Sequence, residues 1–268
     1  MFIHNINPVL ARVGFLEIRY YGAILALSVF LGVALIVHLS RKKNSGIDEN
    51  ILLEALSYMV LAGLAGARIA HILMHDTLFY IQNPFEIIAL WHGGLAAHGA
   101  FIGGALALFL YCRKKKISFY KIADIVVIPL ALGLAFGRIA NFINGELYGR
   151  ITSVPWAVKF PGAEGFRHPS QLYESAKNFI VFLLLICLTK YNSKKRRFKD
   201  GFIFWCFILS YSVLRFIVEF FREPDISFLG LNLGQITSII LIIASIPFLI
   251  SLSKSNPKKE KAKKGKRK

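Results

Sequence analysis

The sequence predicts an all-α fold: a polytopic membrane helical bundle of seven transmembrane helices, with the N-terminus outside and the C-terminus cytoplasmic. Three observations predict it, namely the composition, the length of the apolar stretches and the placement of the basic residues. Of the 268 residues, 55% are hydrophobic and only 18% are charged, and the mean hydropathy is +0.54. Soluble domains have about 25% charged residues. The composition therefore excludes a soluble enzyme, a disordered chain and a disulfide scaffold.

Seven stretches are long and apolar enough to cross about 30 Å of hydrocarbon, which takes about 20 helical residues. They run over residues 20–40, 52–74, 94–112, 119–138, 172–190, 201–221 and 233–252. We expect helices, because a backbone in lipid must satisfy its own hydrogen bonds and no stretch alternates like a barrel strand. The segment 79–92 is too short to cross and contains Pro84 and Trp91. It is expected to lie at the membrane interface.

The basic residues predict the orientation. The loops 41–50, 113–121 and 190–199 and the tail 254–268 together hold 23 of the 33 Lys and Arg, whereas the alternate loops 75–93 and 222–232 hold one. Basic loops stay in the cytoplasm. Residues 1–253 are therefore expected to form one transmembrane domain with an outward-facing segment, 139–171. The tail is expected to be disordered, cytoplasmic and attracted to anionic lipid headgroups, with no nucleic acid as partner.

Charged and imidazole side chains inside the apolar spans are candidate functional residues, since such groups cost several kcal/mol at bilayer depth. They are Arg68, His98, Arg138, Arg215, Glu219 and Arg222. Their spacing places Arg215, Glu219 and Arg222 on one helix face, where an ion pair of Arg215 with Glu219 is a purely structural alternative. The four arginines outnumber the acids identified in the membrane. We therefore expect an anion to complete the cluster, and a phospholipid headgroup is the most abundant one.

Glycines are frequent in the second, third and fourth spans, where small residues let helices approach closely. Gly99 and Gly137 differ from the others because they adjoin His98 and Arg138. There, the missing side chain is expected to leave room for a lipid.

Neither a metal nor another cofactor is expected. The sequence has no P-loop, no GxGxxG and no acidic metal cluster. His71 and His75 are spaced to share a helix face but lack an acidic third ligand nearby.

Several segments, in order along the chain, resemble the bacterial prolipoprotein diacylglyceryl transferase family. The most specific is GRIANFINGELYG at 137–149, and RYYG at 19–22, WHGGLAAHG at 91–99, RHPSQLYE at 167–174 and VEFFREPD at 218–225 agree with it. Two positions depart from the family pattern: His92, where an acid is common, and Ala140, where glycine is common. His92 adds a second imidazole near His98, which leaves the identity of a general base open.

The resemblance implies a multi-pass enzyme of the bacterial inner (plasma) membrane. Its substrates would be phosphatidylglycerol and prolipoprotein signal peptides, and it would join the diacylglyceryl group to the lipobox cysteine through a thioether while glycerol phosphate leaves. The family's important positions fall on Tyr21, His98, Arg138, Asn141, Glu146, Gly149 and Arg215, with Glu219 and Arg222 close by.

These residue types suit that chemistry. Arginine forks match phosphate geometry, so Arg138 and Arg215 are expected to bind the lipid phosphate, with Asn141 and Tyr21 as hydrogen-bonding partners. His98 is the candidate base for the thiol, or alternatively a positioner that leaves thiol activation to the arginine field. Glu146 and Glu219 are expected to orient arginines.

Two other classes of function compete with this one. A transporter or channel for an anionic solute or lipid would also bury arginines, but we see no repeated half. An intramembrane protease would need a serine–histidine or paired aspartate constellation, and neither is present.

Overall fold

The structure is a computed structural model and describes residues 1–14, 16–43, 47–75, 77–89, 93–195, 197–223, 227–228 and 230–253. The tail 254–268 and His92 lie outside the described residues. The described part is mostly helical, and 6 of its helices are long and apolar enough to cross a membrane. A polytopic helical membrane fold is therefore confirmed.

The six candidate spans lie within α1 (Tyr20–Lys43), α2 (Glu49–His75), α5 (Phe119–Asn144), α6 (Ser170–Lys195), α7 (Phe202–Val218) with η3 (Glu219–Phe221), and α8 (Leu233–Ser253). A further long helix, α4 (Ala97–Lys115), occupies the position of the third predicted span. It is less apolar because it contains His98 and three glycines and ends in basic residues. Between α2 and α4 lie α3 (Thr77–Gln82) and η1 (Pro84–Ile87).

The strands are short and form three two-stranded sheets. β1 (Phe2–Ile3) pairs in parallel with β4 (Val158–Lys159), β2 (Val9–Val13) with β3 (Leu16–Arg19), and β5 (Ser227–Phe228) with β6 (Leu231–Asn232), the last two pairs antiparallel. Composition predicted none of them, since each is only two to five residues long.

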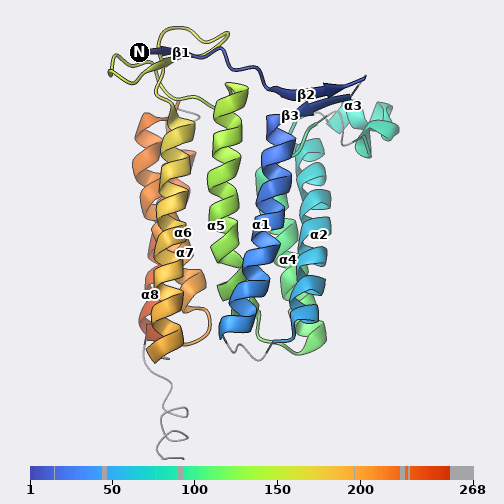
Figure 1. Ribbon diagram of the computed structural model, residues 1–268, viewed down its shortest axis with the longest axis vertical. Coiled ribbons are helices and arrows are strands. Elements are labelled where there is room, and N and C mark those ends of the chain that lie inside the picture. Colours follow the sequence, from blue (N-terminus) through green and yellow to red (C-terminus); the bar gives the residue numbers. More distant parts are fainter. Residues whose placement is uncertain are drawn as a thin grey trace, which may run out of the picture. The chain divides into compact units, whose positions relative to one another are not determined.

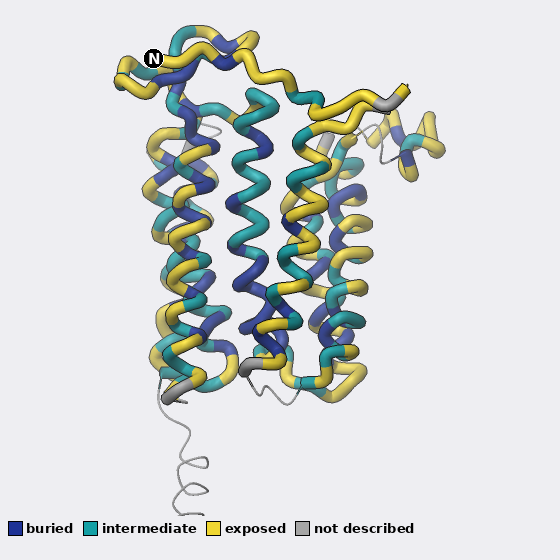
Figure 2. The backbone as a smooth tube through the Cα atoms, in the orientation of Figure 1, coloured by how far each residue is buried: buried dark blue, intermediate teal, exposed yellow. Residues whose placement is uncertain are grey.

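The chain divides into two compact units, the first made of residues 1–38 and 123–268 and the second of residues 39–122. In the first unit α5, α6, α7 and α8 lie side by side (Figure 1). α5 is the most buried of the candidate spans, whereas the other helices of this unit expose apolar faces (Figure 2). Exposed apolar faces on long helices suit contact with lipid.

Two polar contacts set where helices of the first unit begin. Asp124 on α5 is 2% exposed and accepts hydrogen bonds from the backbone N–H groups of Gly201 and Phe204, at 2.9 and 2.8 Å. It thus caps the N-terminus of α7 from a different helix. Asn232 and Gln235 exchange side-chain and backbone hydrogen bonds at the start of α8, at 3.1 and 2.8 Å.

One end of the first unit carries the segment between α5 and α6. Here Val158, Phe160 and Ala163 form a small core with Phe142 and Tyr148, and β1 lies beside this segment (Figure 1). α5 continues to Asn144, past the predicted end at residue 138. The helix therefore presents Asn141 as well as Arg138.

The second unit is built on α2 and α4, which pack closely along their length. A methyl group at Gly99 would collide with the backbone oxygen of Gly66 and the Cβ atom of Ala70. Gly99 is therefore a contact between helix backbones, and the expectation that it leaves room for a lipid is wrong. In contrast, an added methyl group at Gly137 meets nothing within 4 Å, so space beside Arg138 is present.

Candidate functional site

A cluster of six charged side chains lies inside the helices of the first unit. α5 contributes Arg138, α6 contributes Glu174 and Lys177, α7 contributes Arg215, and η3 with the next residue contributes Glu219 and Arg222. We call this set the ionic cluster. The sequence predicted four of its members; Arg138 and Arg215 lie on helices as expected, whereas Glu219 lies in η3 and Arg222 follows it in an extended conformation.

Glu174 is the centre of the ionic cluster. Its side chain is 1% exposed, and Arg215 and Arg222 donate hydrogen bonds to its Oε1 atom, the latter at 2.7 Å. The Oε2 atom lies 3.5 Å from Nε of Arg138 and 3.6 Å from Nζ of Lys177. One carboxylate therefore contacts four cations, which come from three helices and the residue after η3.

Glu219 is the second carboxylate. It lies 2.9 Å from Nε of Arg215 and 3.6 Å from Nε of Arg222, so the predicted ion pair with Arg215 forms. The Cβ atom of any residue at position 234 would approach the carboxylate of Glu219 to 2.7 Å. Gly234 thus leaves the space that this side chain occupies.

The charges of the ionic cluster do not cancel. The three guanidinium groups of Arg138, Arg215 and Arg222 stay protonated and already outnumber the two glutamates, and Lys177 adds a basic group beside Glu174. Glu174 and Lys177 were not predicted from the sequence, so the predicted number of intramembrane acids was too low. Both residues stand within the predicted span 172–190, and the rule that intramembrane charges are functional candidates could have found them.

The three arginines keep N–H groups available for a ligand. Arg138 donates no hydrogen bond to the part of the chain that the structure describes, and the Nη2 atoms of Arg215 and Arg222 donate none there either. Their side chains remain between 17% and 23% exposed. The site can therefore offer several guanidinium donors to one anion.

Asn141, Glu146 and Gly149 lie where α5 ends. The amide nitrogen of Asn141 donates to Oε1 of Glu146 at 2.7 Å, and Asn144 also donates there, at 3.4 Å. The expectation that Glu146 orients an arginine is thus wrong for the described residues, since its carboxylate binds asparagines. Gly149 forms an isolated antiparallel β-bridge with Arg222. A side chain at position 149 would collide with the backbone oxygen of Phe221.

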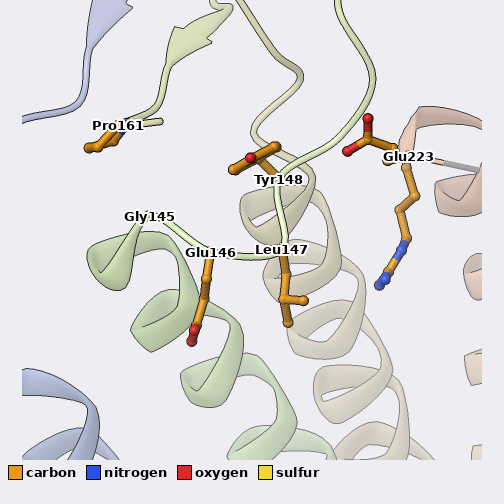
Figure 3. Close-up of a pocket in the computed structure, with 7 residues that line it drawn as sticks. Gly145, Glu146, Leu147, Tyr148, Pro161 and Glu223 are labelled. Atoms are coloured by element: carbon orange, nitrogen blue, oxygen red, sulfur yellow. The ribbon is translucent and has the colours of Figure 1, made fainter. Parts of the chain in front are cut away.

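A cavity of about 470 Å³ opens at this end of the first unit, lined by Gly145, Glu146, Leu147, Tyr148, Pro161, Arg222 and Glu223. In Figure 3 the side chains of Glu146 and Leu147 point toward the helices, whereas Pro161 and Tyr148 lie on the opposite side of the cavity. Arg222 belongs both to the cavity wall and to the ionic cluster. The cavity therefore leads to the excess positive charge.

His168 lies near this cavity, just before α6 and outside the spans. Its Nδ1 atom is 3.1 Å from the hydroxyl of Tyr173, and its ring packs edge-on against Tyr173 and Phe221. Burial lowers the pKa of His168 below the usual 6.5. The imidazole is therefore neutral at pH 7.

Arg68, which the sequence grouped with the other arginines, belongs to the second unit and has a different role. It donates to the backbone oxygens of five residues: Glu86, Ile87, Ala89, Gly93 and Gly94. Gly93 and Gly94 have φ of +85° and +76°, a region that favours glycine. All three guanidinium nitrogens are used, so Arg68 shapes the loop before α4 and has no donor for a ligand.

Two further predicted residues take no part in the contacts described above. Tyr21, at the start of α1, is 39% exposed and forms no hydrogen bond with the ionic cluster among the described residues. His98 is in the first turn of α4, in the second unit, and is exposed. Its imidazole has no hydrogen-bond partner in the described ranges.

Known proteins resemble the chain over nearly its full length. A family model described as prolipoprotein diacylglyceryl transferase matches residues 8–251, which include the whole ionic cluster. A phosphatidylglycerol–prolipoprotein diacylglyceryl transferase from Nitrosomonas europaea is 39% identical, with 98% of this chain and 96% of the relative covered. Proteins of the same name are 41% identical in Bordetella parapertussis (90% and 93% covered) and 35% in Geobacter sulfurreducens (93% and 96%).

Proposed function

The chain belongs to the prolipoprotein diacylglyceryl transferase family, and from this premise we propose how the ionic cluster serves the reaction. The protein is a membrane transferase that moves the diacylglyceryl group of phosphatidylglycerol onto the cysteine thiol of a prolipoprotein. A thioether forms and glycerol phosphate leaves. The relatives support this activity and give no support to an anion transporter.

One observation carries the assignment of the site: three partly buried arginines have available N–H groups and outnumber the two carboxylates that they contact. The reaction breaks a carbon–oxygen bond, and the electron pair stays on the phosphate oxygen. Preorganised donors in a water-poor site stabilise such developing charge. We assign the lipid phosphate to Arg138 and Arg215, as the family resemblance also implies.

The other residues of the site support this binding. Asn141, fixed by Glu146, and Tyr21 are assigned to hydrogen bonds with the headgroup. Glu219 orients Arg215 and Arg222, to which it lies close. Gly149 lets the backbone of Arg222 approach, and Arg222 adds a third guanidinium from the cavity wall.

His98 is assigned to the thiol, as the base that removes its proton or as a hydrogen-bonding positioner. Its exposed, unbonded imidazole suits both roles. His98→Asn separates them, because asparagine keeps a hydrogen-bonding group but cannot accept the proton. A fall in the transfer rate of about 100-fold or more supports the base, since acid–base catalysis contributes at least that much. A modest loss favours the positioner.

We extend the same proposal to the arrangement in the membrane. α4 serves as the seventh span, residues 1–253 form the catalytic domain, the N-terminus faces outward and the C-terminus with its basic tail is cytoplasmic, as the basic loops favour. Segment 139–171 then faces outward and carries the cavity. The membrane is the bacterial inner membrane, and the protein substrates are lipobox-bearing signal peptides.

Purified protein incubated with labelled phosphatidylglycerol and a lipobox peptide tests the function. The peptide should gain the mass of a diacylglyceryl group on its cysteine, and a Cys→Ser peptide should gain nothing. Arg138→Ala should lower the rate by at least about 100-fold, the loss found when one transition-state donor is removed. Near-normal turnover in that variant would refute the assigned phosphate site.

A further inference from the structure

The ionic cluster contains two groups that the function proposed above does not use, Glu174 and Lys177. Glu174 is buried and contacts four cations, yet it lies among arginines that must bind an anion. A carboxylate at this place repels the substrate phosphate. This unfavourable interaction must be offset by a contribution of Glu174 to the reaction.

Geometry indicates what Glu174 does. Arg138 comes from α5, Arg215 from α7 and Arg222 from the residue after η3, and all three contact this one carboxylate. Among the described residues, Glu174 is also the one ion-pair partner of Arg138, since Glu219 contacts Arg215 and Arg222. Without Glu174, like charges from three segments would repel one another and separate.

Charge balance points the same way. When the cysteine has lost its proton, the thiolate and the phosphodiester carry one negative charge each. The sulfur electron pair forms the new C–S bond, the C–O bond breaks, and glycerol phosphate leaves with about two negative charges. The reacting groups therefore carry two negative charges throughout, and the ionic cluster, whose three arginines outnumber its two carboxylates, has positive charge left to stabilise them.

Lys177 is the fourth basic group beside Glu174 and comes from the same helix, α6. It is 3% exposed, lies one helical turn from Glu174 with Nζ 3.6 Å from Oε2, and sits 3.8 Å from the centre of the Tyr211 ring. Its other polar contact is Oδ1 of Asn178, at 2.9 Å. Lys177 can thus influence the position of the arginines through its contact with Glu174. It also remains a partner of that carboxylate while the arginines bind substrate.

We propose that Glu174 is a positioning residue for the transfer. It gathers Arg138, Arg215 and Arg222 around one carboxylate and, together with Lys177, sets the positive excess of the ionic cluster. This proposal rests on the function proposed above and adds to it how the phosphate-binding arginines are held.

The test compares kcat and KM for phosphatidylglycerol in purified, folded variants. Glu174→Gln should lower kcat about 100-fold, the loss expected when transition-state donors are misplaced. Its KM should change by less than about threefold, because the site remains positive and still attracts the headgroup. Glu174→Asp, which keeps the charge, should regain at least about tenfold of the lost kcat. A purely structural role predicts lower thermal stability with normal kcat per folded molecule.

A double-mutant cycle tests the link to Lys177. Lys177→Met should lower kcat about five- to tenfold alone and should have no further effect in the Glu174→Gln protein, since contacting residues are not additive. Glu54→Gln is the matched control. Glu54 also pairs with a lysine, at 3.0 Å, but belongs to the second unit, and its variant should keep wild-type kcat.

The outcomes are separable. No transfer by the wild-type protein defeats the proposed function itself. If the wild type is active and the kcat of Glu174→Gln lies within about threefold of it, the role of Glu174 is overturned while the proposed function stands. Additive effects of Lys177→Met and Glu174→Gln on kcat lead to the same conclusion. If Glu174→Gln does not fold, Glu174→Asp decides: kcat about tenfold below wild type at unchanged KM supports the proposal, and wild-type kcat overturns it.

Discussion

The two units of the molecule bury arginine in opposite ways. Arg68, in the second unit, donates to five backbone oxygens and all of its nitrogens are used. Arg138, in the first unit, lies 3.5 Å from Glu174 and donates no hydrogen bond within the described ranges. Both are charged groups in helices that can span a membrane. The residue type alone therefore does not identify a site, whereas the number of unused donors does.

The difference has a physical basis. Five carbonyl groups satisfy the N–H groups of a guanidinium and leave none for a ligand, so such an arginine holds a loop in shape. Carboxylates that compensate the charge but leave N–H groups unused create a site for a further anion. The comparison predicts that substitution affects folding in the second unit and catalysis in the first.

The largest expected effects contrast Arg68→Met with Arg138→Met. Arg68→Met leaves five backbone oxygens short of donors, and each unsatisfied buried group costs about 1–3 kcal/mol. We expect a loss of stability of about 3 kcal/mol or more and little folded protein. Arg138→Met removes one charge from a cluster with positive excess, so the thermal midpoint should stay within about 2 °C while transfer falls at least about 100-fold. Thermal unfolding and the transfer rate per folded molecule measure the two effects.

An equal loss of stability in both variants would contradict the comparison. Arg41→Met is a control for the loss of an arginine as such. Arg41 pairs with Glu49 at 2.8 Å with its side chain 70% exposed, and exposed pairs contribute about 0–1 kcal/mol.

Six of the seven predicted spans are found as helices long and apolar enough to cross a membrane, because about 20 apolar residues in a row have few other solutions. The sequence also predicted Arg138, Arg215, Glu219 and Arg222 as candidate functional residues, because charged side chains are rare in apolar spans. It could not show that Arg68 is satisfied, because backbone oxygens carry no sequence signal. The role of Glu174 could not be predicted either, since α6 meets α5 and α7 only in the folded chain.

Glycine substitutions in the two units are expected to differ in their effect on stability, by an intermediate amount. An alanine at Gly99 would press against the backbone of α2, whereas an alanine at Gly133, on α5, meets nothing within 4 Å. Gly99→Ala should lower stability by about 2 kcal/mol, a typical cost of overpacking. Gly133→Ala should leave stability unchanged or raise it by up to about 1 kcal/mol through helix propensity. Denaturation of the two variants in the same detergent checks this, and a stable Gly99→Ala protein would show that α2 and α4 can separate.

The smallest expected effect is the pH dependence of stability that arises from His168 in the first unit. Guanidinium groups keep their charge at any physiological pH, so the arginines contribute no titration there, whereas His168 does. Burial lowers its pKa when folded, so the unfolded chain binds more protons below pH 6.5 and stability falls as the pH drops from about 6.5 toward the lowered value. Because His168 is only partly buried, the thermal midpoint should fall by about 1–2 °C between pH 7.5 and 5.5 relative to His168→Asn, which does not titrate. An identical pH dependence in the two proteins would mean that folding does not disfavour the charged imidazole beside Tyr173 and Phe221.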